Sequence, residues 1–332
     1  MRIALVNDTR LAIEALRQAV SSRGYQVAWV AADGAAAVQQ CRQDTPDLIL
    51  MDLVMPVLDG VEATRRIMAE SPCAILIVTA SMSGRSGQVF QALGMGALDV
   101  VRTPSRADGF EPLLSKIATI EKLLQYRRLP TGSLATGNGS DKSGESILVA
   151  IGASAGGPRA VSTVLAGLPR PLAVPVVIVQ HLDKDFADSL AGWLDQQSEI
   201  RVQIAPPGSL VVPGRGLLAG TGLHMVMTPG QRLQYQAEPL DLPYRPSIDT
   251  FFESVARYWK GPVIAVLLTG MGRDGAAGLL KLKMNGHHTI AQDEATSTVY
   301  GMPRAAAEMR AAVEILPLPA IGAAIGRRLK AC

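Results

Sequence analysis

The sequence predicts an α/β protein of two domains, each built around a doubly wound, mostly parallel sheet. The chain has 332 residues, and a domain commonly holds about 100–200 residues, so two domains are expected. Hydrophobic residues make up 48% of the chain, which is enough for two buried cores. Short apolar stretches alternate with segments of helical periodicity, a pattern typical of parallel sheets covered by helices on both faces.

Residues 1–122 contain five apolar stretches with the length and composition of strands. They are Ile3–Val6, Gln26–Val30, Leu48–Met51, Ala74–Thr79 and Asp99–Val101. The helix-length segments are Leu11–Ser22, Gly34–Asp44 and Gly60–Glu70, with a further helix from Pro112 to Arg127. Five such units in about 120 residues predict a flavodoxin-like (βα)5 domain.

Between residues 123 and 145 the apolar pattern stops. Gly, Ser and Thr predominate there, a composition typical of a flexible linker. Strand patterns return in residues 146–332, each followed by a glycine-rich or polar loop. They are Ile147–Ile151, Val174–Val179 and Val263–Leu268, with shorter β segments at Gln203–Val211, Gly216–Ala219 and His224–Thr228. They predict a second open, mostly parallel α/β sheet.

The composition excludes several classes of protein. The net charge is only +3, so a sequence-independent grip on nucleic acid is not expected. Cys41, Cys73 and Cys332 show neither metal-ligand spacing nor a disulfide pattern. Residues 1–6 lead into a strand pattern instead of a signal peptide, and no apolar stretch reaches the roughly 18–20 residues of a membrane span. We therefore expect a cytoplasmic protein that does not insert into the membrane.

Two aspartates follow neighbouring strands of the first predicted sheet. Asp8 comes after the first strand, and Asp52 ends the third. The carboxyl ends of parallel strands line one crevice, so these carboxylates are expected to converge there, with the Thr79 hydroxyl beside them. Two carboxylates repel each other unless a hard cation lies between them, and Mg²⁺ suits such oxygen ligands. The alternative is that each aspartate merely caps the following helix.

The segment Met51-Asp-Leu-Val-Met-Pro-Val-Leu-Asp-Gly60 favours the cation site. Together with Asp8 and Thr79, it resembles the signature of the receiver domain of two-component response regulators. The resemblance implies that Asp52 is the phosphoacceptor and that a sensor histidine kinase is the phosphodonor. It also implies that Asp8, Asp52 and the Val54 carbonyl bind Mg²⁺, and that Thr79 supplies the switch hydroxyl.

Two positions depart from the receiver pattern. Receivers usually carry two acids after the first strand, and the first of these is Asn7 here, which removes one negative charge. After the fifth strand the family has Lys-Pro, but this chain has Arg102-Thr103-Pro104, so Thr103 stands at the lysine position. Arg102 is adjacent but, on a strand, points to the opposite face. Because the cation that pairs with the phosphoryl oxygen is lost, we expect phosphorylation to persist with altered coupling to the output.

Three further side chains suggest acyl-transfer chemistry in the second domain. Ser154 lies in Gly152-Ala-Ser-Ala-Gly-Gly157, between a strand pattern and a helix pattern, where glycines and a helix N-terminus favour an exposed hydroxyl and developing negative charge. His181 ends a strand pattern, and Asp274 follows another. All three can meet in one crevice as nucleophile, general base and orienting carboxylate.

From these residues alone, a nucleotide-binding regulator stays an alternative to a serine hydrolase. A glycine-rich loop between a strand and a helix often binds phosphates, although Gly152–Gly157 matches neither the dinucleotide fingerprint nor a Walker A loop. Single histidines are usually structural, and we interpret His224, His287 and His288 in that way. His181 differs because of its position at a strand end.

Four motifs together resemble the protein-glutamate methylesterases of bacterial chemotaxis, which join a receiver to a catalytic domain through a linker. They are Gly152–Gly157, Gln180-His181, Tyr244-Arg-Pro-Ser-Ile-Asp249 and Leu268-Thr-Gly-Met-Gly-Arg-Asp-Gly275. The resemblance implies that Ser154 is the nucleophile, His181 the general base and Asp274 the residue that orients it. It also implies that the Met271 N–H helps to form the oxyanion hole and that the esterase needs no cofactor.

The implied substrate is the γ-glutamyl methyl ester on the cytoplasmic tails of methyl-accepting receptors, which is hydrolysed to glutamate and methanol. Several members of the family also deamidate glutamine. We expect phosphorylation of Asp52 to move the receiver away from the catalytic cleft, which the linker permits. Asn7 and Thr103 look more like the Wsp-type branch, in which a receptor complex controls a cyclic-di-GMP-producing regulator.

Two rival functions stay open. One is a non-enzymatic signalling adaptor that binds receptor tails, and the other is a nucleotide-dependent oxidoreductase, for which the sequence has no fingerprint.

Overall fold

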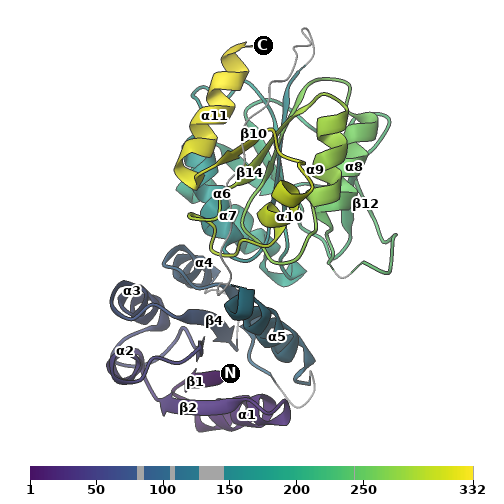
Figure 1. Ribbon diagram of the computed structural model, residues 1–332. Coiled ribbons are helices and arrows are strands. Elements are labelled where there is room, and N and C mark those ends of the chain that lie inside the picture. Colours follow the sequence, from purple (N-terminus) through teal and green to yellow (C-terminus); the bar gives the residue numbers. More distant parts are fainter. Residues whose placement is uncertain (81–85, 105–108, 127–145, 243, 332) are drawn as a thin grey trace. The chain divides into compact units, whose positions relative to one another are not determined.

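The computed structural model of the chain describes residues 1–80, 86–104, 109–126, 146–242 and 244–331. The chain divides into two compact units, Met1–Gly132 and Ser133–Cys332 (Figure 1). Most of the expected linker, residues 127–145, lies outside the described residues. Residues 123–126, which we placed at the start of the linker, belong to the last helix of the first unit, in agreement with the helix predicted from Pro112 to Arg127.

The first unit contains one parallel five-stranded sheet in the order β2-β1-β3-β4-β5, which confirms the flavodoxin-like prediction. Its strands are β1 (Arg2–Val6), β2 (Gln26–Ala31), β3 (Leu48–Met51), β4 (Ala74–Thr79) and β5 (Asp99–Arg102). Its helices are α1 (Arg10–Ser22), α2 (Gly34–Gln43), α3 (Gly60–Glu70), α4 (Ser86–Gly94) and α5 (Glu111–Tyr126). Helices α2, α3 and α4 lie side by side on one face, and α1 contacts α5 on the other (Figure 1).

Local chemistry explains these elements. Every residue of β3 and β4 is buried, as expected of strands covered on both faces. Asp33 and Asp59 cap α2 and α3 by accepting hydrogen bonds from the N–H groups of Ala36 and Glu62. The sequence did not indicate α4, because nine residues with glycine near both ends are too short for a clear helical period.

The second unit contains a parallel seven-stranded sheet in the order β15-β14-β13-β6-β7-β10-β8. Its strands are β6 (Leu148–Ala153), β7 (Val176–Gln180), β8 (Arg201–Ile204), β10 (Arg215–Leu218), β13 (Val263–Leu267), β14 (His288–Gln292) and β15 (Glu314–Leu316). A smaller antiparallel sheet has the order β11-β12-β9. Its strands are β9 (Ser209–Leu210), β11 (His224–Met227) and β12 (Arg232–Gln236). The prediction of a mostly parallel second sheet is confirmed.

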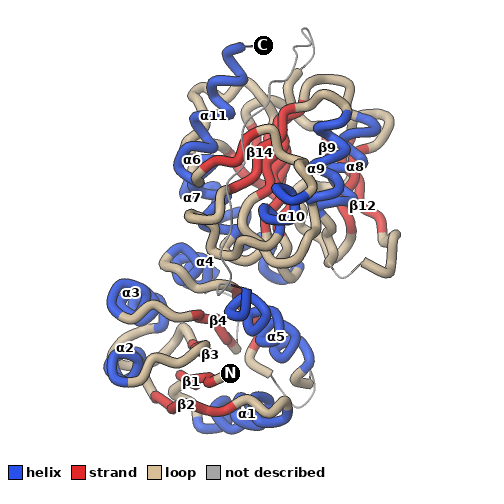
Figure 2. The backbone as a smooth tube through the Cα atoms, in the orientation of Figure 1, coloured by secondary structure: helices blue, strands red, loops and turns tan. Residues whose placement is uncertain are grey.

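Helices cover both faces of the large sheet. They are α6 (Gly157–Ala166), the 3₁₀ helix η1 (Lys184–Phe186), α7 (Ala187–Gln197), α8 (Ile248–Tyr258), α9 (Ala276–Met284), α10 (Met302–Glu308) and α11 (Leu318–Ala331). Helices α6, α7 and α11 form one layer, and α8, α9 and α10 form the other (Figure 2). Within the described residues, no helix is both long and apolar enough to cross a membrane.

One expected β segment is wrong. The sequence suggested a single piece over Gln203–Val211, but its two ends belong to β8 and β9, which lie in different sheets. The intervening Ala205-Pro-Pro-Gly208 cannot continue a ladder, because proline lacks an N–H donor and Gly208 has a φ of 81°.

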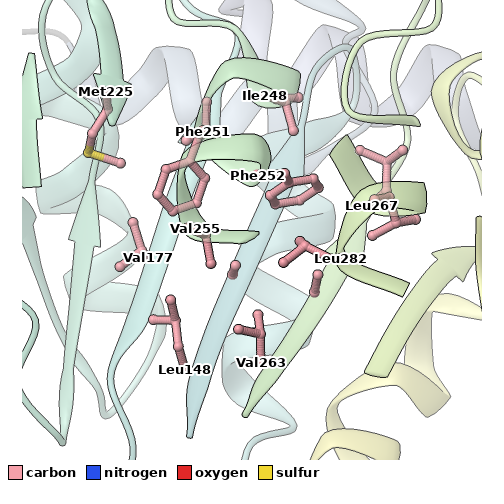
Figure 3. Packing of buried hydrophobic residues seen from close by; sticks show 14 of the residues in the cluster. Leu148, Val177, Met225, Ile248, Phe251, Phe252, Val255, Val263, Leu267 and Leu282 are labelled. Carbon is pink, nitrogen blue, oxygen red and sulfur yellow. The ribbon is translucent and has the colours of Figure 1, made fainter. Parts of the chain in front are cut away.

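A large buried cluster holds α8 against the sheet. Phe251, Phe252 and Val255 of α8 are fully buried against strand residues such as Leu148 and Val177 (Figure 3). Truncation of one such phenylalanine to alanine typically costs about 3–5 kcal/mol. The N-terminus of α8 is therefore held rigidly at the carboxyl edge of the sheet, where the polar residues of the site gather.

Candidate active site

The three predicted catalytic residues follow three adjacent central strands. Ser154 comes directly after β6, His181 directly after β7, and Asp274 lies in the loop between β13 and α9. Strand β6 pairs in parallel with β7 on one side and with β13 on the other. The strand that follows β6 in the chain, β7, therefore lies on one side of β6, and the later strand β13 lies on the other. At such a switch point, α/β sheets bind their ligands at the carboxyl edge.

Ser154 stands on a tight turn into α6. Gly156 has a φ of 74°, and the Gly157 N–H donates to the Ser154 carbonyl oxygen at 2.7 Å. A Cβ added at Gly157 would lie 2.0 Å from Gln180 Oε1, so only glycine fits there. Gln180 Nε2 donates to the carbonyl oxygens of both Ser154 and His181, at 2.8 and 3.0 Å. This amide ties the Ser154 turn to the strand end that carries His181.

His181 and Asp274 form a buried pair. His181 Nε2 lies 2.7 Å from Asp274 Oδ2, and the two side chains are only 6% and 11% exposed. The carboxylate also accepts hydrogen bonds at the start of α8, from Ser247 Oγ at 2.9 Å, Ile248 N at 2.7 Å and Asp249 N at 3.0 Å. Burial opposes ionisation, but the His181 contact and these backbone donors hold the pKa of Asp274 at about 2.

The other ring nitrogen of His181 is buried and has no hydrogen-bond partner among the described residues. Because an ionised carboxylate only accepts, Nε2 carries the proton and Nδ1 keeps a free lone pair. Tyr244 stacks on the imidazole with ring centroids 4.3 Å apart and planes 11° apart. The ring is therefore held on one face and at one nitrogen, while the basic nitrogen is free to accept a proton.

The loop after β13 packs against the turn that carries Ser154. The Ser154 N–H donates to the Thr269 carbonyl oxygen at 3.0 Å, and a Cβ added at Gly270 would lie 2.6 Å from Ser154 Cβ. Met271 follows directly, and none of the hydrogen bonds formed within the described chain uses its N–H. This placement suits a donor for an oxyanion that develops beside Ser154.

The carboxyl edge of the first sheet carries the predicted phosphorylation site. Asn7 is buried, and its Nδ2 donates to Asp52 Oδ2 at 3.0 Å. Asp52 Oδ1 accepts the Leu53 N–H at 2.7 Å. Asp8 is exposed, and Thr79 is buried at the end of β4. The Thr103 N–H donates to the Thr79 carbonyl oxygen at 3.0 Å.

Thr103, at the lysine position of the receiver pattern, has a buried hydroxyl without a hydrogen-bond partner among the described residues. Arg102 is exposed on the neighbouring position of β5.

The oxygen donors at this edge fit a magnesium ion. The described residues contain no cluster of three or more His, Cys, Asp or Glu side chains suited to a metal. Asp8 follows β1 and Asp52 follows the neighbouring strand β3, and two carboxylates suit a cation that retains several waters. Asn7 stands where receivers usually have a second acid, and its amide donates to Asp52.

Sequence reasoning missed two polar residues of the catalytic edge and assigned no role to a third. Ser247 and Tyr244 lie in a motif that was used only for its family likeness, and His224 was interpreted as structural. A signal for Ser247 was present, because a serine directly before the amphipathic segment Ile248–Tyr258 is a typical N-cap. Tyr244 and His224 had no such signal.

The chain is similar to known proteins over nearly its full length. Residues 149–325 match the family model described as CheB methylesterase, and residues 3–112 match the response regulator receiver domain. A protein-glutamate methylesterase/protein-glutamine glutaminase of Burkholderia lata is 52% identical over 325 residues, covering 96% of both chains. A protein of the same description from Pseudomonas putida is 53% identical and covers 97% of both chains.

A solved structure resembles the second unit. The crystal structure of the Thermotoga maritima CheB methylesterase catalytic domain matches with a TM-score of 0.53 and 34% identity, covering 55% of this chain and 99% of that chain.

Proposed function

The chain belongs to the CheB methylesterase family, and we propose that it hydrolyses glutamyl methyl esters of proteins with Ser154 as the nucleophile, under the control of its receiver domain. The observation that carries this proposal is the state of His181. One imidazole nitrogen is bonded to a buried carboxylate, and the other is buried with no partner among the described residues, on the strand end beside Ser154. A general base needs this arrangement.

In the proposed reaction, Ser154 Oγ attacks the ester carbonyl carbon while its proton passes to His181 Nδ1. The Met271 N–H stabilises the negative charge on the carbonyl oxygen. His181 then gives the proton to the methoxy oxygen, the carbon–oxygen bond breaks, and methanol leaves the acyl-enzyme. Water attacks the acyl carbon while its proton passes to His181. His181 then returns this proton to Ser154 Oγ as the bond between the acyl carbon and the serine oxygen breaks, which releases a glutamate side chain and restores the enzyme. The ionised Asp274 holds the Nε2–H tautomer and stabilises the imidazolium.

The same steps process a glutamine side chain, with ammonia as the leaving group. The Burkholderia and Pseudomonas relatives carry both activities in their names. We assign both substrates to this chain, with glutamyl side chains on the cytoplasmic tails of methyl-accepting receptors as the protein targets.

We assign the phosphoacceptor role to Asp52, with a sensor histidine kinase as donor. Asp8, Asp52 and the Val54 carbonyl would hold Mg²⁺, which neutralises charge on the transferring phosphoryl group when it is bound. Thr79 and Thr103 would offer their hydroxyls to the phosphoryl oxygens, and Asn7 its amide. Neutral donors would thus replace the ammonium group that receivers usually provide.

The test is methanol release from a methylated receptor tail by the full-length protein. We expect release by the wild type and loss of it in Ser154→Ala. Ser209→Ala is the matched control, because Ser209 lies on β9 of the small sheet, where its Oγ donates to the Pro206 carbonyl oxygen. The protein would be an adaptor instead if Ser154→Ala and wild type both bound the tail and neither released methanol after phosphodonor treatment.

A further inference from the structure

A fully buried histidine stands behind the catalytic carboxylate. His224 begins β11, its exposed fraction is 0%, and the reaction described above does not use it. Its Nε2 lies 3.1 Å from the Pro239 carbonyl oxygen, and its Nδ1 lies 3.1 Å from the Ser247 backbone nitrogen. A carbonyl only accepts and an amide N–H only donates, so both contacts are satisfied by one tautomer, with the proton on Nε2 and the lone pair on Nδ1.

Ser247 connects this histidine to the active site. Its N–H donates to His224 Nδ1, and its Oγ donates to Asp274 Oδ1 at 2.9 Å while accepting the Thr250 N–H at 3.2 Å. Ser247 is the N-cap of α8, and the next two N–H groups of the chain are the other α8 donors to Asp274. The position of Ser247 therefore sets three of the hydrogen bonds that orient the carboxylate.

The Ser247 N–H depends on His224 for its partner. Ser247 is only 1% exposed, and a buried N–H without an acceptor is strongly unfavourable. If Nδ1 were removed, Ser247 would have to shift toward water or another acceptor. Because α8 is held against the sheet by its buried phenylalanines, the change would fall on its first turn, which contacts Asp274.

We propose that His224 is a positioning residue of the hydrolytic reaction, acting through Ser247 and the first turn of α8 on the orientation of Asp274 toward His181. The inference rests on the proposed esterase function. The chain of contacts runs from the Pro239 carbonyl through His224 and Ser247 to the catalytic pair, and its outer end is a loop remote in sequence from the three catalytic residues.

Two conservative variants separate the two ring nitrogens. Asparagine places an amide oxygen near the Nδ1 position and can still accept the Ser247 N–H, whereas glutamine reaches the Nε2 position and keeps only the contact with Pro239. For His224→Gln we expect kcat for methanol release to fall roughly 10- to 100-fold with KM changed less than about twofold, since misplacement of a catalytic group by about 1 Å has effects of this size. His224→Asn should keep most of the activity.

His288→Gln is the matched control, because His288 lies on β14 and contacts Glu314 at 2.8 Å, away from Asp274. It should leave kcat unchanged. Equal losses in His224→Gln and His224→Asn, or no loss in His224→Gln, would overturn the proposal.

A second measurement distinguishes positioning from a general loss of folded protein. In an Asp274→Asn background, His224→Gln should cause almost no further fall in kcat, because both changes act on the same orienting group. A fall as large as in the wild-type background would show that His224 acts independently of Asp274 and would overturn the proposal.

The proton resonance of His181 Nε2–H provides a readout without substrate. It should shift in His224→Gln and stay in place in His224→Asn, and an unchanged resonance in both would contradict the inference. Failure of the esterase function itself has a different signature, because the wild type would then release no methanol while this resonance still responded.

Discussion

Asp52 and Asp274 occupy equivalent places in two parallel sheets, yet their surroundings differ. Each lies at the carboxyl edge, near the strand at which the chain reverses its direction across the sheet. Asp274 is nearly buried and is held by His181, by the Ser247 hydroxyl and by two N–H groups of α8. Asp52 is partly exposed, with the Asn7 amide on one oxygen and the Leu53 N–H on the other.

The difference shows how the carboxyl edge of a parallel sheet can suit two kinds of chemistry. A carboxylate that must orient a base is best surrounded by fixed donors, which keep it ionised and immobile. A carboxylate that must itself react needs open space and cation ligands beside it, such as the exposed Asp8. Under the proposed roles, dense hydrogen bonding therefore distinguishes the aspartate that would orient the base, and exposure distinguishes the aspartate that would be phosphorylated.

The largest effect is expected when the charge of the buried carboxylate of Asp274 is removed. Asp274→Asn should lower kcat for methanol release by roughly 10³- to 10⁴-fold, because the amide neither fixes the Nε2–H tautomer nor stabilises the imidazolium. Asp188→Asn on the exposed first turn of α7 is the control and should have no effect. A loss of less than about tenfold would mean that Asp274 does not orient the base.

The matching change at the partly exposed Asp52 should remove phosphorylation and leave basal methanol release in place. In Asp52→Asn we expect no phosphoryl incorporation from acetyl phosphate and Mg²⁺, and no change in methanol release on adding that donor. Asp33→Asn is the control, since asparagine also caps helices well and Asp33 caps α2. Mass spectrometry of the intact protein measures incorporation, and modification of Asp52→Asn at the wild-type level would refute the assignment.

The two departures from the receiver pattern should show opposite effects on cation binding. Asn7→Asp adds a carboxylate and should tighten Mg²⁺ binding roughly tenfold, whereas Thr103→Lys adds a cation and should weaken it by a similar factor. The double variant should bind Mg²⁺ about as tightly as the wild type. Calorimetric titration of the full-length protein provides the affinities, and two single changes of the same sign would contradict the charge argument.

The smallest effect concerns Asp249, which lies beside Asp274. Burial raises the pKa of Asp249 to about 6, with a smaller contribution from the charge of Asp274, although Gly278 N–H donates to its carboxylate. The folded state therefore holds this proton more tightly than the unfolded chain, and the contribution of Asp249 to stability decreases as pH rises from about 4 to 6.

Asp249→Asn keeps an acceptor for Gly278 and removes this titration. Relative to wild type it should stabilise the second unit at pH 7 by an amount on the order of 1 kcal/mol, with the difference shrinking toward pH 4. Urea unfolding at both pH values measures it. A difference independent of pH would show that the carboxyl is not perturbed by burial.

Much of the molecule was predictable, because local patterns and sheet topology act together. Parallel strands place their following residues at one edge, so the contact between His181 and Asp274 agrees with the expectation that these residues share one crevice. The split of Gln203–Val211 between two sheets was not predictable from periodicity, since both halves have the same β pattern. The sequence also did not indicate β12, β14 or β15.

The sequence by itself determined the two α/β sheets, the residues at their carboxyl edges and the family, because apolar periodicity, strand-end polar residues and motif spacing are all local. Only the tertiary structure decided which partners those residues have. Packing of α8 against the sheet brings Ser247 to Asp274. Pairing of β11 with β12 fixes the position of His224, which begins β11. Such contacts join segments that are distant in the chain, so no local pattern specifies them, and burial then makes each one costly to leave unmade.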